Sequence, residues 1–330
     1  MQNRRDFVKE MVAGAAVLGT GAKFALGESQ TKTARKSKVV IVRDAKLRTP
    51  GPSPDEKRVA AMLDHAMQTY FNAQNPVQPW KEIVRPGQVV GLKVNTLGRA
   101  LSPNPALVAA ICERLQQAGI KAGDIIVWDR SSRDMQAAGF KLTTAPGGVR
   151  FFASDTAGYE GASVSYGTVT TRLSKILTQC DVVINMPVLK NHNLAGVTMA
   201  MKNMYGVINN PNAMHGTACN PSIADLNMIP AIRQKVRFVI GDMMTAVYEG
   251  GPSYRPEYAW NEDGLIVGED RVAIDTICAQ IIERKRAEKG LKTLEQNGTP
   301  WHYIATAADA QHRLGTNDPV QIALIEHSIA

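Results

Sequence analysis

The segment from residue 89 to residue 129 decides the fold class of this 330-residue chain, because its pattern predicts a strand, a helix and a second strand in succession. It contains the apolar run VVGLKV at 89–94, the helix-forming run NPALVAAICERLQQAG at 104–119 and the run IIVWD at 125–129. Asn104 can cap the helix, Pro105 suits its first position and Gly119 can end it. Two short buried strands joined by a helix predict parallel pairing through a crossover connection.

Further short apolar runs extend this pattern along the chain. They lie at 39–42, 182–184, 238–240 and 265–267. A capping box, Ser53-Pro54-Asp55-Glu56, predicts a helix to Tyr70 with Pro54 at its first position. Two more helices are expected to begin at Asp270 and at Trp301. Residues 140–172 have many Gly and Thr and a weaker periodicity. We therefore predict an α/β fold: a mostly parallel sheet with helices on both faces and a small irregular β-rich insertion.

The composition is that of a folded protein, and its charge is unevenly distributed. Hydrophobic residues make up 44% and charged residues 21%, which argues against intrinsic disorder and collagen-like repeats. The net charge of +8 divides into +2 for residues 1–27, +3 for 28–38 and +3 for 39–330. The main part of the chain is nearly balanced and has no interleaved basic and aromatic pattern, so we expect no nucleic-acid partner.

Residues 1–27 resemble a twin-arginine (Tat) signal peptide. Asn3-Arg4-Arg5-Asp6-Phe7-Val8-Lys9 matches its pattern of a polar residue, two arginines, any residue, Phe, a hydrophobe and Lys. A weakly apolar stretch follows, but Lys23 interrupts it and leaves fewer than the ~18 consecutive apolar residues expected of a membrane-spanning helix. We expect Tat export to the periplasm or another extracytoplasmic compartment, with the Tat translocation machinery as partner. The signal is either cleaved, leaving no stable transmembrane segment in the mature chain, or retained as an anchor.

The rest of the chain is predicted to form a basic linker at 28–38 and a single α/β domain at 39–330. Its cysteines are widely spaced, at Cys112, Cys180, Cys219 and Cys278. No Cys-x-x-Cys occurs, so the local spacing of iron–sulfur, zinc-ribbon and haem-attachment motifs is missing. We expect buried free thiols, with at most one distant disulfide, and no iron–sulfur cluster.

Polar residues follow the core strands at the edge where a parallel sheet binds ligands. They are Lys93-Val94-Asn95, Asp129-Arg130-Ser131-Ser132, Asn185-Met186-Pro187 and Gly241-Asp242. The segment after the 182–184 strand is also unusual, because the 43 residues between Asp181 and Asp225 include no Asp or Glu. With no carboxylate to neutralise them, Lys190 and Lys202 suit a small anionic ligand. The alternative is an Asn-rich loop whose lysines are solvated.

This segment resembles domain-of-unknown-function family 362 (DUF362). The resemblance rests on Pro187-Val188-Leu189-Lys190-Asn191-His192, Gly196-Val197-Thr198 and Lys202-Asn203-Met204-Tyr205-Gly206. Flanking motifs lie at 93–95, 102–105, 240–242, 249–252 and 270–275. It extends over most of residues 38–330. Some relatives carry a ferredoxin-like iron–sulfur domain, which implies redox work in those relatives, whereas this chain has no clustered cysteines.

The candidate site residues come from these motifs and strand ends. On an extended strand Lys190 and His192 would share a face, so one could hold an anion while the other moves a proton. Thr198 and Lys202 are four apart, which predicts neighbours on one helix face. The candidate catalytic residues are Lys190, His192, Lys202, Asp242 and Asp275. The candidate substrate-binding residues are Lys93, Asn95, Thr198 and Asn203.

Two interpretations of function remain open. The first is an exported enzyme that acts on a small anionic substrate at the strand ends, with a divalent metal as a candidate cofactor and Asp242 and Asp275 as its nearest acids. The alternative is a non-enzymatic redox-accessory protein that binds a metal or cofactor. His215, Cys219 and eight of the 13 Met, between Met186 and Met244, would suit copper(I), but filling of an irregular core explains the methionines better.

Overall fold

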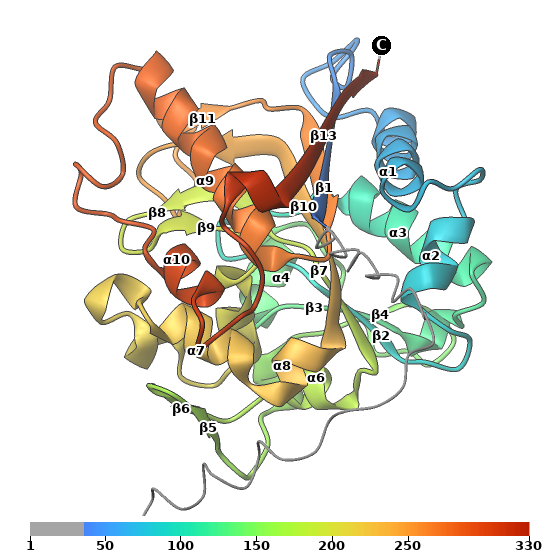
Figure 1. The fold of residues 1–330 in the computed structure, drawn as a ribbon. Helices are drawn as coiled ribbons and strands as arrows, with labels where there is room; N and C mark the ends of the chain where they lie inside the picture. Colours follow the sequence, from blue (N-terminus) through green and yellow to red (C-terminus); the bar gives the residue numbers. More distant parts are fainter. Residues whose placement is uncertain (1–35, 330) are drawn as a thin grey trace, which may run out of the picture. The chain divides into compact units, whose positions relative to one another are not determined.

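One long mixed sheet organises residues 36–329, the part of the chain that the computed structural model describes (Figure 1). Its main strands follow the order β13-β1-β12-β10-β7-β2-β3-β4. Their bounds are β1 (Ser37–Asp44), β2 (Val90–Lys93), β3 (Ile125–Trp128), β4 (Arg150–Phe151), β7 (Val182–Asn185), β10 (Val236–Val247), β12 (Gly264–Gly268) and β13 (Ile322–Ile329). Along this path only β12 runs antiparallel to its neighbours. The predicted mostly parallel sheet is confirmed.

Three shorter strands extend the sheet beside β10. They are β8 (Val188–His192), β9 (Gly196–Thr198) and β11 (Ala259–Trp260). β8 pairs in parallel with β10 and forms an antiparallel hairpin with β9. The hairpin places the acid-free part of the sequence next to the end of the central sheet.

Helices cover both faces of the sheet, as predicted, because the strands are apolar on both sides. On β1, Val40 and Val42 belong to one hydrophobic cluster and Val39 and Ile41 to the other. The first cluster is covered by α1 (Glu56–Phe71), α2 (Gln78–Ile83), α3 (Pro105–Gln117) and α4 (Ser132–Ala137). The second is covered by α6 (Lys175–Gln179), α7 (Ser222–Met228), α8 (Pro230–Lys235), α9 (Arg271–Glu288) and α10 (Tyr303–Ala308).

The remaining elements are short. They comprise α5 (Ser154–Ala157), the hairpin of β5 (Val164–Tyr166) and β6 (Val169–Thr171), and the 3₁₀ turns η1 (Ala122–Asp124), η2 (Lys202–Val207), η3 (Pro211–Met214), η4 (Thr217–Cys219), η5 (Pro256–Tyr258) and η6 (Pro319–Gln321). The predicted insertion therefore contains a separate two-stranded hairpin, while β4 from the same region joins the main sheet beside β3. Between residues 36 and 329, no helix combines the length and the hydrophobicity that crossing a bilayer requires.

Two predicted boundaries differ from the structure. Helix α1 begins at Glu56, and its N-cap is Asp55 rather than Ser53. The Asp55 side chain accepts a hydrogen bond from the Arg58 N–H. The Asp55 N–H donates to the Leu47 carbonyl, which holds this residue and those before it outside the helix. Strand β1 begins at Ser37, inside the range expected for the linker. The predicted signal at 1–27 and residues 28–35 of the predicted linker lie outside the described residues.

Candidate functional site

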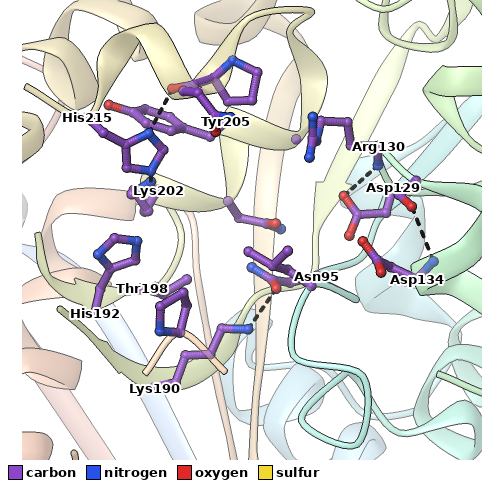
Figure 2. Close-up of a pocket in the computed structure, with 17 residues that line it drawn as sticks. Asn95, Asp129, Arg130, Asp134, Lys190, His192, Thr198, Lys202, Tyr205 and His215 are labelled. Atoms are coloured by element: carbon purple, nitrogen blue, oxygen red, sulfur yellow. Dashed lines mark hydrogen bonds between the residues drawn. The ribbon is translucent and has the colours of Figure 1, made fainter. Parts of the chain in front are cut away.

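A pocket of about 180 Å³ opens where β2 and β3 end, and the β8–β9 hairpin, η2 and η3 complete its wall. Figure 2 shows Lys190, His192, Thr198 and Lys202 on one side and Asp129, Arg130 and Asp134 on the other. The pocket lies at the strand ends where the sequence predicted a site. Six of the nine candidate residues line it: Asn95, Lys190, His192, Thr198, Lys202 and Asn203.

The β8–β9 hairpin brings three of these side chains together. Lys190 pairs directly with Thr198 across the two strands, and His192 pairs with Gly196. Because alternate residues of a strand point to the same face, Lys190 and His192 both reach the pocket, as predicted. Thr198 and Lys202 also line it, but not as neighbours on a helix, since Thr198 ends β9 and Lys202 begins η2.

Lys190 is a fully buried lysine without a carboxylate partner. Its side chain is 0% exposed, and within residues 36–329 its Nζ makes one hydrogen bond, to Asn95 Oδ1 at 2.9 Å. Burial lowers the pKa of Lys190 to about 8; Asp129 opposes this shift, and the charges of Lys93 and Lys202 add to it. The amino group therefore titrates close to neutral pH.

Lys202 is also buried without a carboxylate among the described residues, but its surroundings differ. Its Nζ lies 3.6 Å from the centroid of the Tyr205 ring and 3.2 Å from His215 Nε2. His215 Nδ1 is 2.9 Å from the Pro211 carbonyl, which can only accept, so Nδ1 carries the hydrogen and Nε2 accepts from Lys202. Burial lowers the pKa of Lys202 to about 8.

His192 is held in one tautomer. Its Nδ1 accepts hydrogen bonds from the Leu194 N–H at 3.1 Å and the Ala195 N–H at 3.2 Å, so the neutral ring carries its hydrogen on Nε2. Burial, together with the charge of Lys202, lowers the pKa of His192 to about 2. This geometry makes the neutral His192 ring a hydrogen-bond donor; the sequence left open which of Lys190 and His192 would move a proton.

Lys93, a predicted substrate-binding residue, lies beneath the pocket rather than in its lining. Its Nζ donates to Asp129 Oδ1 at 2.7 Å, to the Val94 carbonyl at 2.6 Å and to Asn203 Oδ1 at 3.1 Å. Burial acts to raise the pKa of Asp129, but the Lys93 ammonium and two backbone N–H groups outweigh it and hold that pKa below its ordinary value. This ion pair supports the pocket floor.

Asn203 and Gly206 explain part of the Lys202–Gly206 motif. Asn203 Nδ2 donates to Asn185 Oδ1 at 2.7 Å and to the Lys93 carbonyl at 3.1 Å, which fixes η2 over the strand ends. A Cβ on Gly206 would lie 2.5 Å from Lys93 Nζ and 2.7 Å from Asp129 Oδ1. Glycine is therefore required for the backbone of η2 to pass this close to the ion pair.

Thr198 carries an orphaned polar atom in the pocket wall. The residue is 4% exposed, and its Oγ1 has no hydrogen-bond partner within residues 36–329. An unsatisfied buried hydroxyl costs about 1–3 kcal/mol, so its place in a pocket lining suggests a role in binding a ligand.

Two of the predicted catalytic residues, Asp242 and Asp275, are not part of the lining of this pocket. Asp242 accepts from the Asn104 and Met244 N–H groups, each at 2.8 Å, and burial raises its pKa to about 6. Asp275 accepts from the Ala200 N–H at 2.7 Å and the Tyr303 hydroxyl at 3.0 Å, and burial raises its pKa to about 7. Both carboxylates therefore fix neighbouring backbone segments through hydrogen bonds from their N–H groups.

Sequence reasoning omitted several pocket residues from the candidate site. Arg130 and Asp134 follow β3, and the polar cluster after this strand was a signal for them. Tyr205 lies inside the recognised motif, and His215 lies in the acid-free segment. Their contacts with Lys202 depend on the fold of η2 and η3, which has no periodic pattern.

Metal binding receives no support from the described residues. Between residues 36 and 329, no group of three or more His, Cys, Asp or Glu side chains could hold a metal ion. His215 Nε2, a candidate copper ligand, faces Lys202 instead. The four cysteines are buried and free, as expected, and burial raises the pKa of Cys219 above its ordinary value.

The fold and site define an α/β protein with a polar pocket at the ends of its parallel strands, in which two lysines lie buried. The chain belongs to the family described as domain of unknown function (DUF362), whose profile matches residues 90–280, more than half of the chain. A thylakoid-associated protein of Synechocystis sp. is 31% identical over 140 residues, which are 40% of this chain and 43% of that protein. The chain thus matches less than half the length of this relative.

Two solved structures show a distant likeness to this chain. A crystal structure of a Thermotoga maritima protein aligns with 72% of this chain and 60% of its own, at 10% identity and a TM-score of 0.38. The lactate racemase apoprotein from Thermoanaerobacterium thermosaccharolyticum aligns with 73% of this chain and 56% of its own, at 11% identity and a TM-score of 0.36.

Proposed function

We propose that this chain is an enzyme that binds a small organic anion in the strand-end pocket. The observation that carries the proposal is the pair of buried lysines, Lys190 and Lys202, which line one pocket with no carboxylate bonded to either within residues 36–329. Burying an unpaired ammonium costs several kcal/mol. An anion between the two lysines would supply the missing charge.

The pocket also offers neutral donors for such an anion. His192 presents Nε2–H, and Thr198 presents a hydroxyl that lacks a protein partner in the described part of the chain. Together with the two ammonium groups, these donors suit a carboxylate or a similar oxyanion. Lysines that titrate near pH 8 could in addition exchange protons with a bound substrate.

Titration calorimetry with acetate, oxalate and phosphate tests the binding. We expect at least one anion to bind, and expect Lys190→Met and Lys202→Met each to weaken it at least tenfold. Lys289→Met, at an exposed position outside the pocket, is the matched control and should leave affinity unchanged. If no anion binds, or if the control weakens binding as much as the pocket variants, the proposal is wrong.

Proton exchange distinguishes an enzyme from a binding protein. Small carboxylic and 2-oxo acids incubated with the protein in deuterated water should lose proton signals next to the carboxyl or carbonyl carbon, as followed by nuclear magnetic resonance. Lys190→Met should abolish this exchange. Binding without exchange or any other conversion would leave a binding protein rather than an enzyme.

Divalent-metal assistance and a redox-accessory role remain alternatives. A metal in this pocket would compete for groups already engaged, since Asp129 pairs with Lys93 and His215 Nε2 accepts from Lys202. Elemental analysis of protein folded in its native host decides this point. A stoichiometric metal that Lys190→Met does not displace would favour the alternative.

We also propose, from the sequence alone, export through the Tat machinery to an extracytoplasmic compartment. Arg4 and Arg5 are the residues on which this depends. Replacing both with lysine should leave precursor in the cytoplasm, as measured by fractionation and immunoblotting, with Lys32→Arg as a control outside the motif. Undiminished export of the double variant would overturn this part of the proposal.

A further inference from the structure

The two pocket lysines differ in their hydrogen bonding. An ammonium donates three hydrogens and has no lone pair, whereas a neutral amine donates two and keeps one lone pair. Lys202 lies over the Tyr205 ring and donates to His215 Nε2, and both contacts favour its charged form. Lys190 Nζ has a single acceptor among residues 36–329, the amide oxygen of Asn95, and this suits a neutral amine.

We propose that Lys190 forms an imine with the carbonyl carbon of a small 2-oxo acid whose carboxylate is held by Lys202. This inference rests on the anion-binding function proposed above and names the substrate class for the same pocket. It assigns different roles to the two lysines: Lys202 remains the cation that anchors the substrate, and Lys190 supplies the nucleophile.

The other pocket groups fit this chemistry. His192 lies two residues from Lys190 on the same strand, and its Nε2–H is a neutral donor of the kind that can polarise a carbonyl oxygen. Thr198 lies directly across the hairpin from Lys190, where its unpartnered hydroxyl can bond the carboxylate or the oxygen of the addition intermediate. The pocket volume of about 180 Å³ suits a small substrate.

The proposed step needs no redox partner. The lone pair of neutral Lys190 Nζ adds to the carbonyl carbon as the carbon–oxygen π bond opens, and one proton passes from the nitrogen to the oxygen to give a carbinolamine. The remaining carbon–oxygen bond then breaks, the oxygen leaves as water with the second nitrogen proton, and a carbon–nitrogen double bond forms. Burial, which lowers the pKa of Lys190 to about 8, increases the fraction of neutral amine near neutral pH.

Reductive trapping tests the inference directly. The full chain is incubated with pyruvate, 2-oxobutyrate or 2-oxoglutarate in the presence of sodium cyanoborohydride, which adds hydride to an imine and makes the adduct permanent. We expect the intact mass to increase by one reduced adduct, and peptide mass spectrometry to place it on Lys190. Acetate, which has no ketone, should slow trapping by competition.

Three variants sharpen the test. Lys190→Arg keeps a charge but cannot form an imine, and it should give no specific adduct; Lys190→Met serves the same purpose if the arginine variant does not fold. Lys202→Arg keeps the anchoring charge and should still be labelled at Lys190. Lys289→Arg, at an exposed position, should behave as the wild type.

Each outcome has a definite meaning. An adduct on Lys190 that both Lys190 variants abolish supports the inference. Calorimetric binding of 2-oxo acids without an adduct, or labelling confined to another lysine, overturns the inference while the anion-binding function stands. If neither binding nor trapping occurs with any of these acids or with the simple anions, the proposed function fails as well.

Discussion

Lys93 and Lys190 are both 0% exposed, but they are buried in opposite ways. Lys93 has three acceptors, one of them the Asp129 carboxylate, so its charge is neutralised within the fold. Lys190 has one neutral acceptor, Asn95, and faces a pocket. A buried lysine whose ammonium is paired with a carboxylate stabilises the fold. A buried lysine that has no such partner and lies beside a cavity indicates a ligand-binding site. The predictions below test this distinction.

The largest expected effect separates the two lysines by stability. Lys93→Met leaves the Asp129 carboxylate buried without its cation, which should lower the free energy of unfolding by about 3–5 kcal/mol. Lys190→Met leaves no carboxylate unpaired and should change it by less than about 1 kcal/mol, or increase it. Urea denaturation of both variants measures the difference. Equal losses would mean that Lys190 is as structural as Lys93.

A second prediction tests the Lys93–Asp129 ion pair without replacing either residue. In Gly206→Ala the new methyl group would lie within 2.5 Å of Lys93 Nζ, so η2 or the ion pair must shift. We expect a loss of about 1–3 kcal/mol in unfolding free energy and weaker anion binding. Gly161→Ala is the control, since a Cβ there meets no heavy atom within 4 Å. A tolerated Gly206→Ala would show that the ion pair adapts easily.

Much of the fold could be predicted because central strands buried on both faces are continuous apolar runs. The run at 125–128 coincides with β3, and the cap at Asn104 with the start of α3. Strand β8 has the polar core Lys190-Asn191-His192, and no hydrophobic pattern marks it. The strand can be buried because residues distant in the sequence form hydrogen bonds with its polar side chains. For example, Asn191 Oδ1 accepts a hydrogen bond from the Gly251 N–H at 2.7 Å.

The site could be predicted in part because the apolar runs locate the strand ends, and polar residues follow these ends in the sequence. Strand ends and the recognised motif grouped Lys190, His192 and Lys202, and the structure places all three in the lining of one pocket. Asp242 and Asp275 lie outside this pocket, where each carboxylate accepts from backbone N–H groups, and Asp242 also lines a second pocket beside Asn104. In a sequence, a carboxylate at either of these places looks the same as one that lines the first pocket.

The pH dependence of anion binding tests whether Lys190 and Lys202, which have no carboxylate partner within residues 36–329, have lowered pKa values. Oxalate has no ketone for neutral Lys190 to attack, so its binding should favour the ammonium forms of both lysines, which prevail below the pKa of about 8 that burial gives Lys190 and Lys202. Affinity for oxalate should therefore be highest below pH 8 and fall above it, by up to about tenfold per pH unit for each lysine. Calorimetry from pH 6 to 9.5 measures this. Affinity that stays constant to pH 9.5 would contradict the lowered pKa values.

The smallest expected effect comes from removing one hydroxyl group, that of Thr198. Its loss should change stability and anion affinity in opposite directions. Thr198→Val keeps the shape of the side chain and removes a buried hydroxyl that has no partner within residues 36–329. If that hydroxyl serves a ligand, the variant should be about 1 kcal/mol more stable and bind oxalate up to tenfold more weakly. Thr276→Val is the contrast, since the Thr276 hydroxyl donates to the Val272 carbonyl at 2.8 Å, and its loss should leave binding unchanged without raising stability. A Thr198→Val protein that is less stable and binds normally would mean that the hydroxyl has a structural partner. Lys190, Lys202 and His192 would then remain as proposed anion donors without Thr198.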